Sequence, residues 1–159
     1  MKNREISRQF QQLNTLFQSA SEATDGNIEL QSHWARYLCV LAAGLLENAL
    51  VELYRNYAAS QASEYVTNFV VSRLERIQNP KTERFLEVAG TFKPQWRRDL
   101  EEYVDDGGRR EAIDSIMTNR HQIAHGNQRQ FNLSLVRLRE YIKKASDVLD
   151  FIENQLDIE

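Results

Sequence analysis

Cysteine is almost absent from this chain of 159 residues, and proline and glycine are scarce. The only cysteine, Cys39, has no second thiol to pair with, so an intrachain disulfide is excluded and a reducing, cytoplasmic setting is expected. The first ten residues lack the apolar core of a secretion signal. Two prolines and six glycines provide few turn residues, which favours a small number of long helices.

Long apolar runs and charge of one sign are also missing. The longest apolar run, "YLCVLAAGLL" at residues 37–46, is too short to span a bilayer and indicates a buried helix, so no membrane partner is expected. The net charge of −3 is not typical of a general nucleic-acid binder. Residues 81–144 nevertheless carry 13 Lys and Arg against 10 Asp and Glu. This leaves two interpretations open: ordinary solvated helix faces, or a mildly basic groove on a mildly acidic body.

The apolar periodicity predicts a single all-α domain over residues 1–159. No window alternates with the period of a strand. Helices are expected at residues 3–23, 28–60, 63–77 and 109–125, with a last one at 134–156 and two short ones within 81–106, divided at "GTFKP". The helix at 28–60 is apolar over a wide arc, which indicates a central position. The prediction is a helical bundle with one long central helix and a long C-terminal helix.

Two of the three histidines lie in "TNRHQIAHGN", residues 118–127. His121 and His125 are four residues apart and share a helix face, a spacing that suits two metal ligands. The residues between them offer no third ligand, so no metal or other cofactor is expected. Cys39 could in principle pair with a histidine as a nucleophile, but its apolar surroundings argue against a reactive thiolate.

Arg120 lies five residues before His125, and this pair suits phosphodiester chemistry. An arginine holds a phosphate through two parallel hydrogen bonds, and a histidine exchanges protons near neutral pH. RNA supplies its own nucleophile, the 2′-hydroxyl, so one proton-transferring residue and one cation can cleave it without a metal. The alternative is that both residues are surface cations that interact favourably with the dipole at a helix C-terminus.

The motif "NRHQIAHG", placed before the last long helix of an all-α chain, resembles that of the HEPN domain family, in particular stand-alone RiboL-PSP-type HEPN proteins. The helix containing "LLENALVELYRNYA" adds to the resemblance, which extends over residues 28–156. The resemblance implies a metal-independent endoribonuclease of a toxin–antitoxin or anti-phage system. It also implies a homodimer whose two motifs face one cleft. Arg120 and His125 would be the catalytic pair and His121 an accessory polar residue.

Some members of that family are noncatalytic, so the alternative function is a silent helical module that dimerises or binds a partner protein or nucleotide. Some toxin members also carry a tyrosine two positions after the catalytic histidine, which an antitoxin modifies. Asn127 occupies this position here, which argues against that route of regulation. The expected partners are RNA, a second copy of the chain and a cognate antitoxin or regulatory protein.

Three further residues are predicted to support the site. Glu47 lies on an apolar stripe of the central helix, where a buried carboxylate needs a partner, and Arg120 is the expected one. The alternative is that this edge of the helix reaches solvent. Asn48 and Asn119, which opens the motif, could supply further hydrogen bonds. Tyr54 and Tyr57 are assigned to the core or, alternatively, to the dimer surface.

Overall fold

The computed structural model describes residues 1–127, 129 and 131–157, and these residues form seven α-helices and no strand. The prediction of an all-α bundle is therefore confirmed. The helices are α1 (Arg4–Ala23), α2 (Ile28–Gln61), α3 (Glu64–Leu74), α4 (Thr82–Phe92), α5 (Pro94–Asp105), α6 (Arg109–Ala124) and α7 (Leu135–Asp157).

Local chemistry explains where the helices begin and end. The side chains of Asn3 and Asn27 cap α1 and α2 by accepting hydrogen bonds from backbone amides of the first turn. Pro94 occupies the first turn of α5, where its missing amide hydrogen costs nothing. The third helix is shorter than predicted. It ends at Leu74, and the chain turns through Asn79, whose φ of 49° is incompatible with a right-handed helix.

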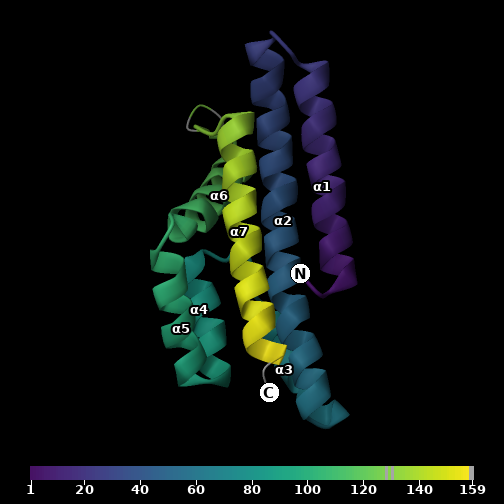
Figure 1. Cartoon of the computed structure of the whole chain (residues 1–159), viewed down its shortest axis with the longest axis vertical. Helices are drawn as coiled ribbons and strands as arrows, with labels where there is room; N and C mark the ends of the chain where they lie inside the picture. The colour runs from purple at the N-terminus through teal and green to yellow at the C-terminus, as the bar shows by residue number, and fades with distance from the viewer. Residues whose placement is uncertain (128, 130, 158–159) are drawn as a thin grey trace.

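The long helix α2 is central, as its composition predicts. Figure 1 shows α1 and α7 running alongside it, with α4, α5 and α6 beyond α7 and α3 at the lower end. Helix α2 packs against α1, α3, α6 and α7, and α5 packs against α4, α6 and α7. By length and composition α2 could cross a membrane, but 56% of its most apolar window is buried inside the protein. Burial of this kind is typical of the core helix of a folded domain.

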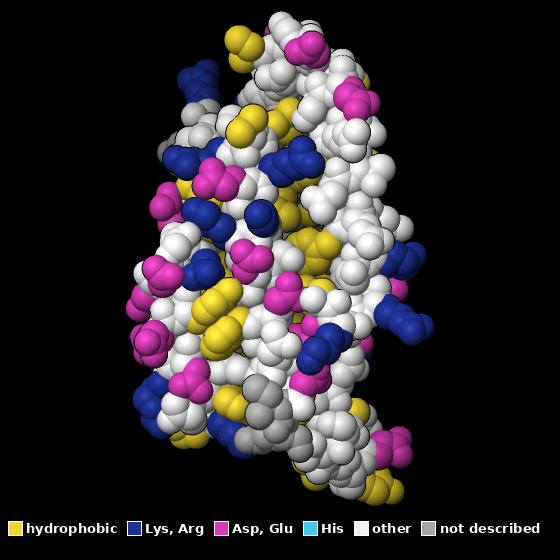
Figure 2. All heavy atoms as spheres, viewed as in Figure 1, with side chains coloured by type: hydrophobic (Ala, Val, Ile, Leu, Met, Phe, Trp, Pro, Cys, Tyr) yellow, Lys and Arg dark blue, Asp and Glu magenta, His cyan; other side chains and the backbone are white. Residues whose placement is uncertain are grey.

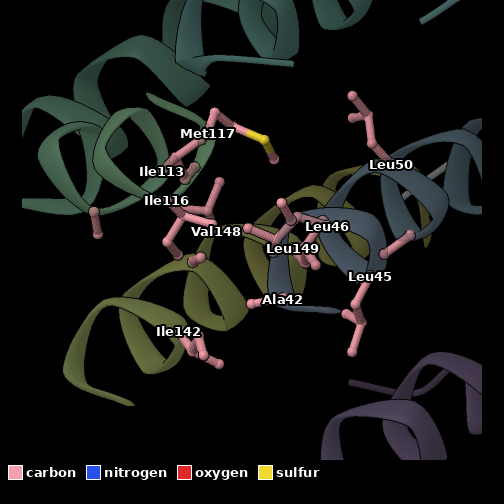
Figure 3. Close-up of a cluster of buried hydrophobic side chains, with 14 of the residues drawn as sticks. Ala42, Leu45, Leu46, Leu50, Ile113, Ile116, Met117, Ile142, Val148 and Leu149 are labelled. Carbon is pink, nitrogen blue, oxygen red and sulfur yellow. The ribbon is translucent and has the colours of Figure 1, made fainter. Parts of the chain in front are cut away.

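The core lies where α2, α6 and α7 meet. Figure 3 shows Ile113, Ile116 and Met117 of α6 close to Val148 and Leu149 of α7, with apolar residues of α2 completing the cluster. All five are fully buried. Their burial fixes the axial position of α6 and therefore the position of the arginine–histidine motif at its end.

A groove of about 670 Å³ lies between α1 and α7. Its walls include Phe10 of α1 and Ile142 of α7, with Arg139 and Lys143 at its edge. Figure 2 shows this face, and no histidine is visible on it. None of the motif residues lines the groove. The motif therefore lies on another part of the surface.

Candidate active site

The motif sits at the C-terminus of α6, which ends in a Schellman arrangement. His125 is the C-cap residue, and Gly126 follows with a φ of 74°. The amide of Gly126 donates to the carbonyl of Ile123 (3.2 Å), and the amide of Asn127 donates to that of Gln122 (2.9 Å). Glycine is suited to this left-handed position because it has no Cβ. The glycine after the histidine thus ends the helix at a defined residue and leaves the His125 side chain exposed.

The two histidines of the motif are in contact. The ring centroids of His121 and His125 are 4.2 Å apart, with an angle of 56° between the ring planes. Both side chains are exposed. This contact follows from their spacing, because residues four apart lie on the same side of a helix. Two imidazoles can therefore approach the same ligand from one side of α6.

Arg120 differs from both histidines because it is half-buried. Within the described residues it forms no ion pair and no side-chain hydrogen bond, so its guanidinium is not neutralised by a carboxylate. Five residues correspond to about 140° of rotation around a helix axis, so Arg120 and His125 leave α6 on different sides. A single copy of the motif therefore presents its cation and its proton-transferring group in different directions.

Asn119 anchors the segment that follows the motif. It is 4% exposed, and its Nδ2 donates to the carbonyl oxygen of Ser115 (2.8 Å). Its Oδ1 accepts a hydrogen bond from the amide of Asn132 (3.2 Å). This second bond ties the connection between α6 and α7 back to the helix at the residue before Arg120. Asn119 is thus placed to act through structure, by holding the surroundings of the motif in position.

No pattern in the sequence singles out Arg36, His33 and Phe131, which the packing of α2 and of the α6–α7 connection places toward the end of α6. The Sγ of Cys39 on α2 contacts the carbonyl oxygen of Ile116 on α6 (3.5 Å), and the two helices run in opposite directions (Figure 1). Arg36, about one turn before Cys39, therefore lies on the same side as Arg120, about one turn after Ile116. This proximity depends on how α2 packs against α6, and no local pattern in the sequence predicts that packing.

Cys39 itself is fully buried, and burial raises the pKa of its thiol to about 12. Because the thiolate is the reactive form, this thiol is not an active nucleophile. This agrees with the expectation, drawn from its apolar surroundings, that Cys39 does not form a reactive thiolate.

The predicted pairing of Glu47 with Arg120 is wrong. Glu47 is half-buried, and its Oε2 accepts a hydrogen bond from the backbone amide of Asn79 (2.5 Å), the residue with positive φ between α3 and α4. No ion pair joins it to Arg120 in the described chain. The reason is axial position: α6 meets α2 at Cys39, so its C-terminal end lies toward the start of α2, away from Glu47. Asn48 is exposed and lines surface grooves next to α1.

Tyr54 and Tyr57 belong to the interior of the chain. Tyr54 is fully buried, stacks on Phe92 with ring centroids 4.9 Å apart, and has its pKa raised by burial. Tyr57 is half-buried and packs edge-on against Phe92 (5.8 Å) and Trp96 (5.1 Å). Of the two assignments left open by the sequence, the core assignment is the correct one for Tyr54.

The profile of the RiboL-PSP-HEPN family matches residues 4–157, nearly the whole chain. Neither the curated proteins nor the solved structures contain a significant match.

Proposed function

The chain belongs to the RiboL-PSP-HEPN family, and we propose that it is a metal-independent endoribonuclease whose catalytic residues are Arg120 and His125. The observation that carries the proposal is the state of Arg120: a half-buried cation without a carboxylate partner in the described chain, at the helix end that also carries two histidines in ring contact. Partial burial of an unpaired cation costs stability, so a bound anion is a natural reason for it. The phosphate of RNA supplies that anion.

The reaction that suits these residues is an internal transfer at phosphorus. A histidine takes the proton of the ribose 2′-hydroxyl, and the 2′-oxygen attacks the adjacent phosphorus. The bond from phosphorus to the 5′-oxygen of the next nucleotide breaks, and that oxygen receives a proton from a second imidazole or from water. Arg120 stabilises the negative charge that accumulates on the phosphate oxygens. The products are a 2′,3′-cyclic phosphate and a free 5′-hydroxyl.

A homodimer would complete this arrangement. Since Arg120 and His125 leave α6 on different sides, a two-fold axis near the motif would bring the Arg120 of one copy toward the His125 of the other. Tyr37 and Val40 of α2 are 52% and 39% exposed and follow Arg36 within about one turn. Exposed apolar residues of this kind on α2 offer surface for a second copy.

The biological role that fits is that of a toxin or anti-phage effector, acting on cytoplasmic RNA and restrained by an antitoxin or regulatory protein. An uncontrolled ribonuclease damages its own cell, so a partner that restrains it is expected. His121 and Asn119 support the catalytic pair, the first by its contact with His125 and the second by anchoring the following segment.

The experiment that tests this function is incubation of the purified protein with total RNA in the presence of EDTA. Cleavage should persist, and the new 3′ ends should carry 2′,3′-cyclic phosphate. Cleavage that stops with EDTA and returns with a divalent metal would overturn the mechanism. A protein that binds RNA or a partner protein but never cleaves would instead support the noncatalytic alternative.

A further inference from the structure

We propose that Arg36, His33 and Phe131 form a nucleotide-binding subsite that holds single-stranded RNA beside the catalytic motif. Arg36 would bind a backbone phosphate next to the one that is cleaved, and Phe131 would stack on an unpaired base. The inference rests on the proposed ribonuclease function, and it extends that function by naming residues and a form of substrate.

The subsite is assembled from two segments that are distant in the sequence. The guanidinium carbon of Arg36 on α2 lies 5.9 Å from the centre of the Phe131 ring, which belongs to the connection between α6 and α7. The Nη1 of Arg36 lies 3.4 Å from the Nδ1 of His33, one turn earlier on the same helix. Asn132, the neighbour of Phe131, is hydrogen-bonded to Asn119. The subsite is thus joined directly to the residue before Arg120.

The charges of the subsite are not balanced within the chain. In the part of the chain that the structure describes, neither Arg36 nor His33 forms an ion pair with a carboxylate. Arg36 is half-buried, and its Nε is buried without a hydrogen-bond acceptor. An unsatisfied buried donor on a cation lowers stability, so stability alone does not account for this arrangement. The guanidinium also has no counter-charge in the described chain, and an anionic ligand at its outer edge would supply one.

The geometry favours single-stranded RNA over a duplex. Stacking of a base on an aromatic ring or on a guanidinium plane needs an unstacked base, which a single strand offers and a regular helix does not. The half-buried Phe131 ring carries Arg36 at cation–π distance, so the two planar groups lie together. Arg36 and Arg120 would then contact neighbouring phosphates on one strand.

The test uses a variant that binds but does not cleave. In a His125→Ala background, the affinity for a fluorescent, unstructured RNA oligonucleotide is measured by anisotropy at several salt concentrations. Adding Arg36→Ala should weaken binding on the order of 10-fold and reduce the salt slope by about 0.7, the value for one lost phosphate contact to a single strand. Phe131→Leu should weaken binding by a similar factor with an unchanged slope, because stacking is not ionic. His33→Ala should give a smaller loss.

A charge-matched control is Arg98→Ala, since Arg98 is an exposed arginine of α5 whose Nη2 donates to Gln95. It should bind RNA like the His125→Ala parent. Arg36→Lys keeps the charge but lacks the planar group, so it should retain the salt slope and lose part of the affinity. Thermal unfolding of each variant identifies any loss caused by misfolding, and Phe131→Tyr, which keeps the ring, should restore binding.

The outcomes separate this inference from the proposed function. In an otherwise intact protein, Arg36→Ala should raise KM for a short RNA more than it lowers kcat. Normal cleavage with unchanged KM in Arg36→Ala and Phe131→Leu would overturn the subsite and leave the ribonuclease proposal standing. A protein that binds the oligonucleotide through Arg36 but cleaves no RNA would overturn the ribonuclease proposal alone. Equal loss of binding in Arg36→Ala and Arg98→Ala would also overturn the subsite, because it would show only a general effect of charge.

Discussion

The basic side chains at the two ends of helix α6 differ in whether they have carboxylate partners. At the start, Arg109 bonds to the carbonyl oxygen of Tyr103 and to Asp106, and the Nε of Arg110 contacts Asp105 at 2.6 Å. At the end, Arg120, His121 and His125 have no carboxylate partner within the described residues. The contrast therefore indicates that the start of α6 is built for stability and that its end is available to an external anion.

The acidic residues of α6 reinforce this contrast. Asp114 accepts a hydrogen bond from the amide of Thr82 at the start of α4 (2.7 Å), and Glu111 accepts one from the hydroxyl of Tyr141 on α7 (2.5 Å). Both acids lie in the first half of the helix, and both join it to a neighbouring helix. From Ser115 onward α6 contains no acidic residue. The four predictions that follow test the two ends against each other.

The largest effect is expected at the C-terminal end of α6, called the unpaired end because its cations have no carboxylate partner in the described chain. The N-terminal end, with Arg109 and Arg110, is called the paired end. His125→Ala should lower RNA cleavage on the order of 10²–10⁴-fold through loss of proton transfer, and Arg120→Ala should do the same through loss of charge stabilisation. Single-turnover cleavage and thermal unfolding measure the two consequences separately. The matched control is Arg110→Ala at the paired end, which should leave cleavage unchanged and cost roughly 0.2–1 kcal/mol of stability. Equal loss of activity in Arg110→Ala and Arg120→Ala would contradict the functional difference between the ends.

The second prediction concerns how the unpaired ends of two copies combine. If Arg120 of one copy works with His125 of the other, mixing the Arg120→Ala and His125→Ala chains should restore activity. Random exchange makes about half of the dimers mixed, and each mixed dimer holds one intact site of two, so about a quarter of the original activity should return. Light scattering should give twice the chain mass. No recovery, with mixed dimers demonstrated by native mass spectrometry, would show that the pair does not operate between copies.

The third prediction concerns the buried residue at the unpaired end. Asn119→Ala removes both the donor to Ser115 and the acceptor for Asn132, so it should cost about 1–3 kcal/mol of stability. It should also lower activity, because the segment after the motif loses its attachment. Asn119→Asp keeps the acceptor and should retain the bond from Asn132 while losing the donor. Full activity of Asn119→Ala at a temperature where it is folded would show that Asn119 is purely structural.

Much of this architecture could be predicted from the sequence because the relevant interactions are local. Asparagine caps, Pro94 and the glycine at position 126 act within a few residues, so the predicted helix boundaries agree with the structure except at the end of α3. The apolar stripe of the last helix, in which Leu138, Ile142 and Leu149 recur at helical spacing, is buried. The spacing of Arg120 and His125 on one helix is also a local pattern, and together with the family resemblance it predicts them as the candidate pair.

The failures arise where a residue's partner is set by the packing of distant helices. Glu47 was correctly recognised as an acid that needs a partner, but its periodicity does not say which segment covers it. The covering segment is the turn at Asn79, which no helix pattern marks. No pattern in the sequence marks Arg36, since its position relative to α6 follows from the contact between Cys39 and Ile116, residues on two separate helices. Only after α6 is placed on α2 do the cations of both helices become neighbours.

The smallest effect is expected at the paired end and depends on pH. The hydrogen bond to Glu111 raises the pKa of Tyr141, with further contributions from desolvation and from the charge of Glu111. The unfolded tyrosine ionises near pH 10, whereas the folded one ionises at higher pH, so its contribution to stability is complete below pH 10 and is lost as the pH rises above it.

Tyr141→Phe should therefore cost about 1 kcal/mol of stability at neutral pH. Between pH 10 and 11, the free energy of unfolding of this variant should fall less steeply with pH than that of the parent. Chemical denaturation at pH 7, 9 and 10.5 measures this difference, and RNA cleavage at pH 7 should be unchanged because the bond lies at the end of α6 opposite the motif. A variant with the same alkaline loss of stability as the parent would show that the bond between Tyr141 and Glu111 does not contribute to folding.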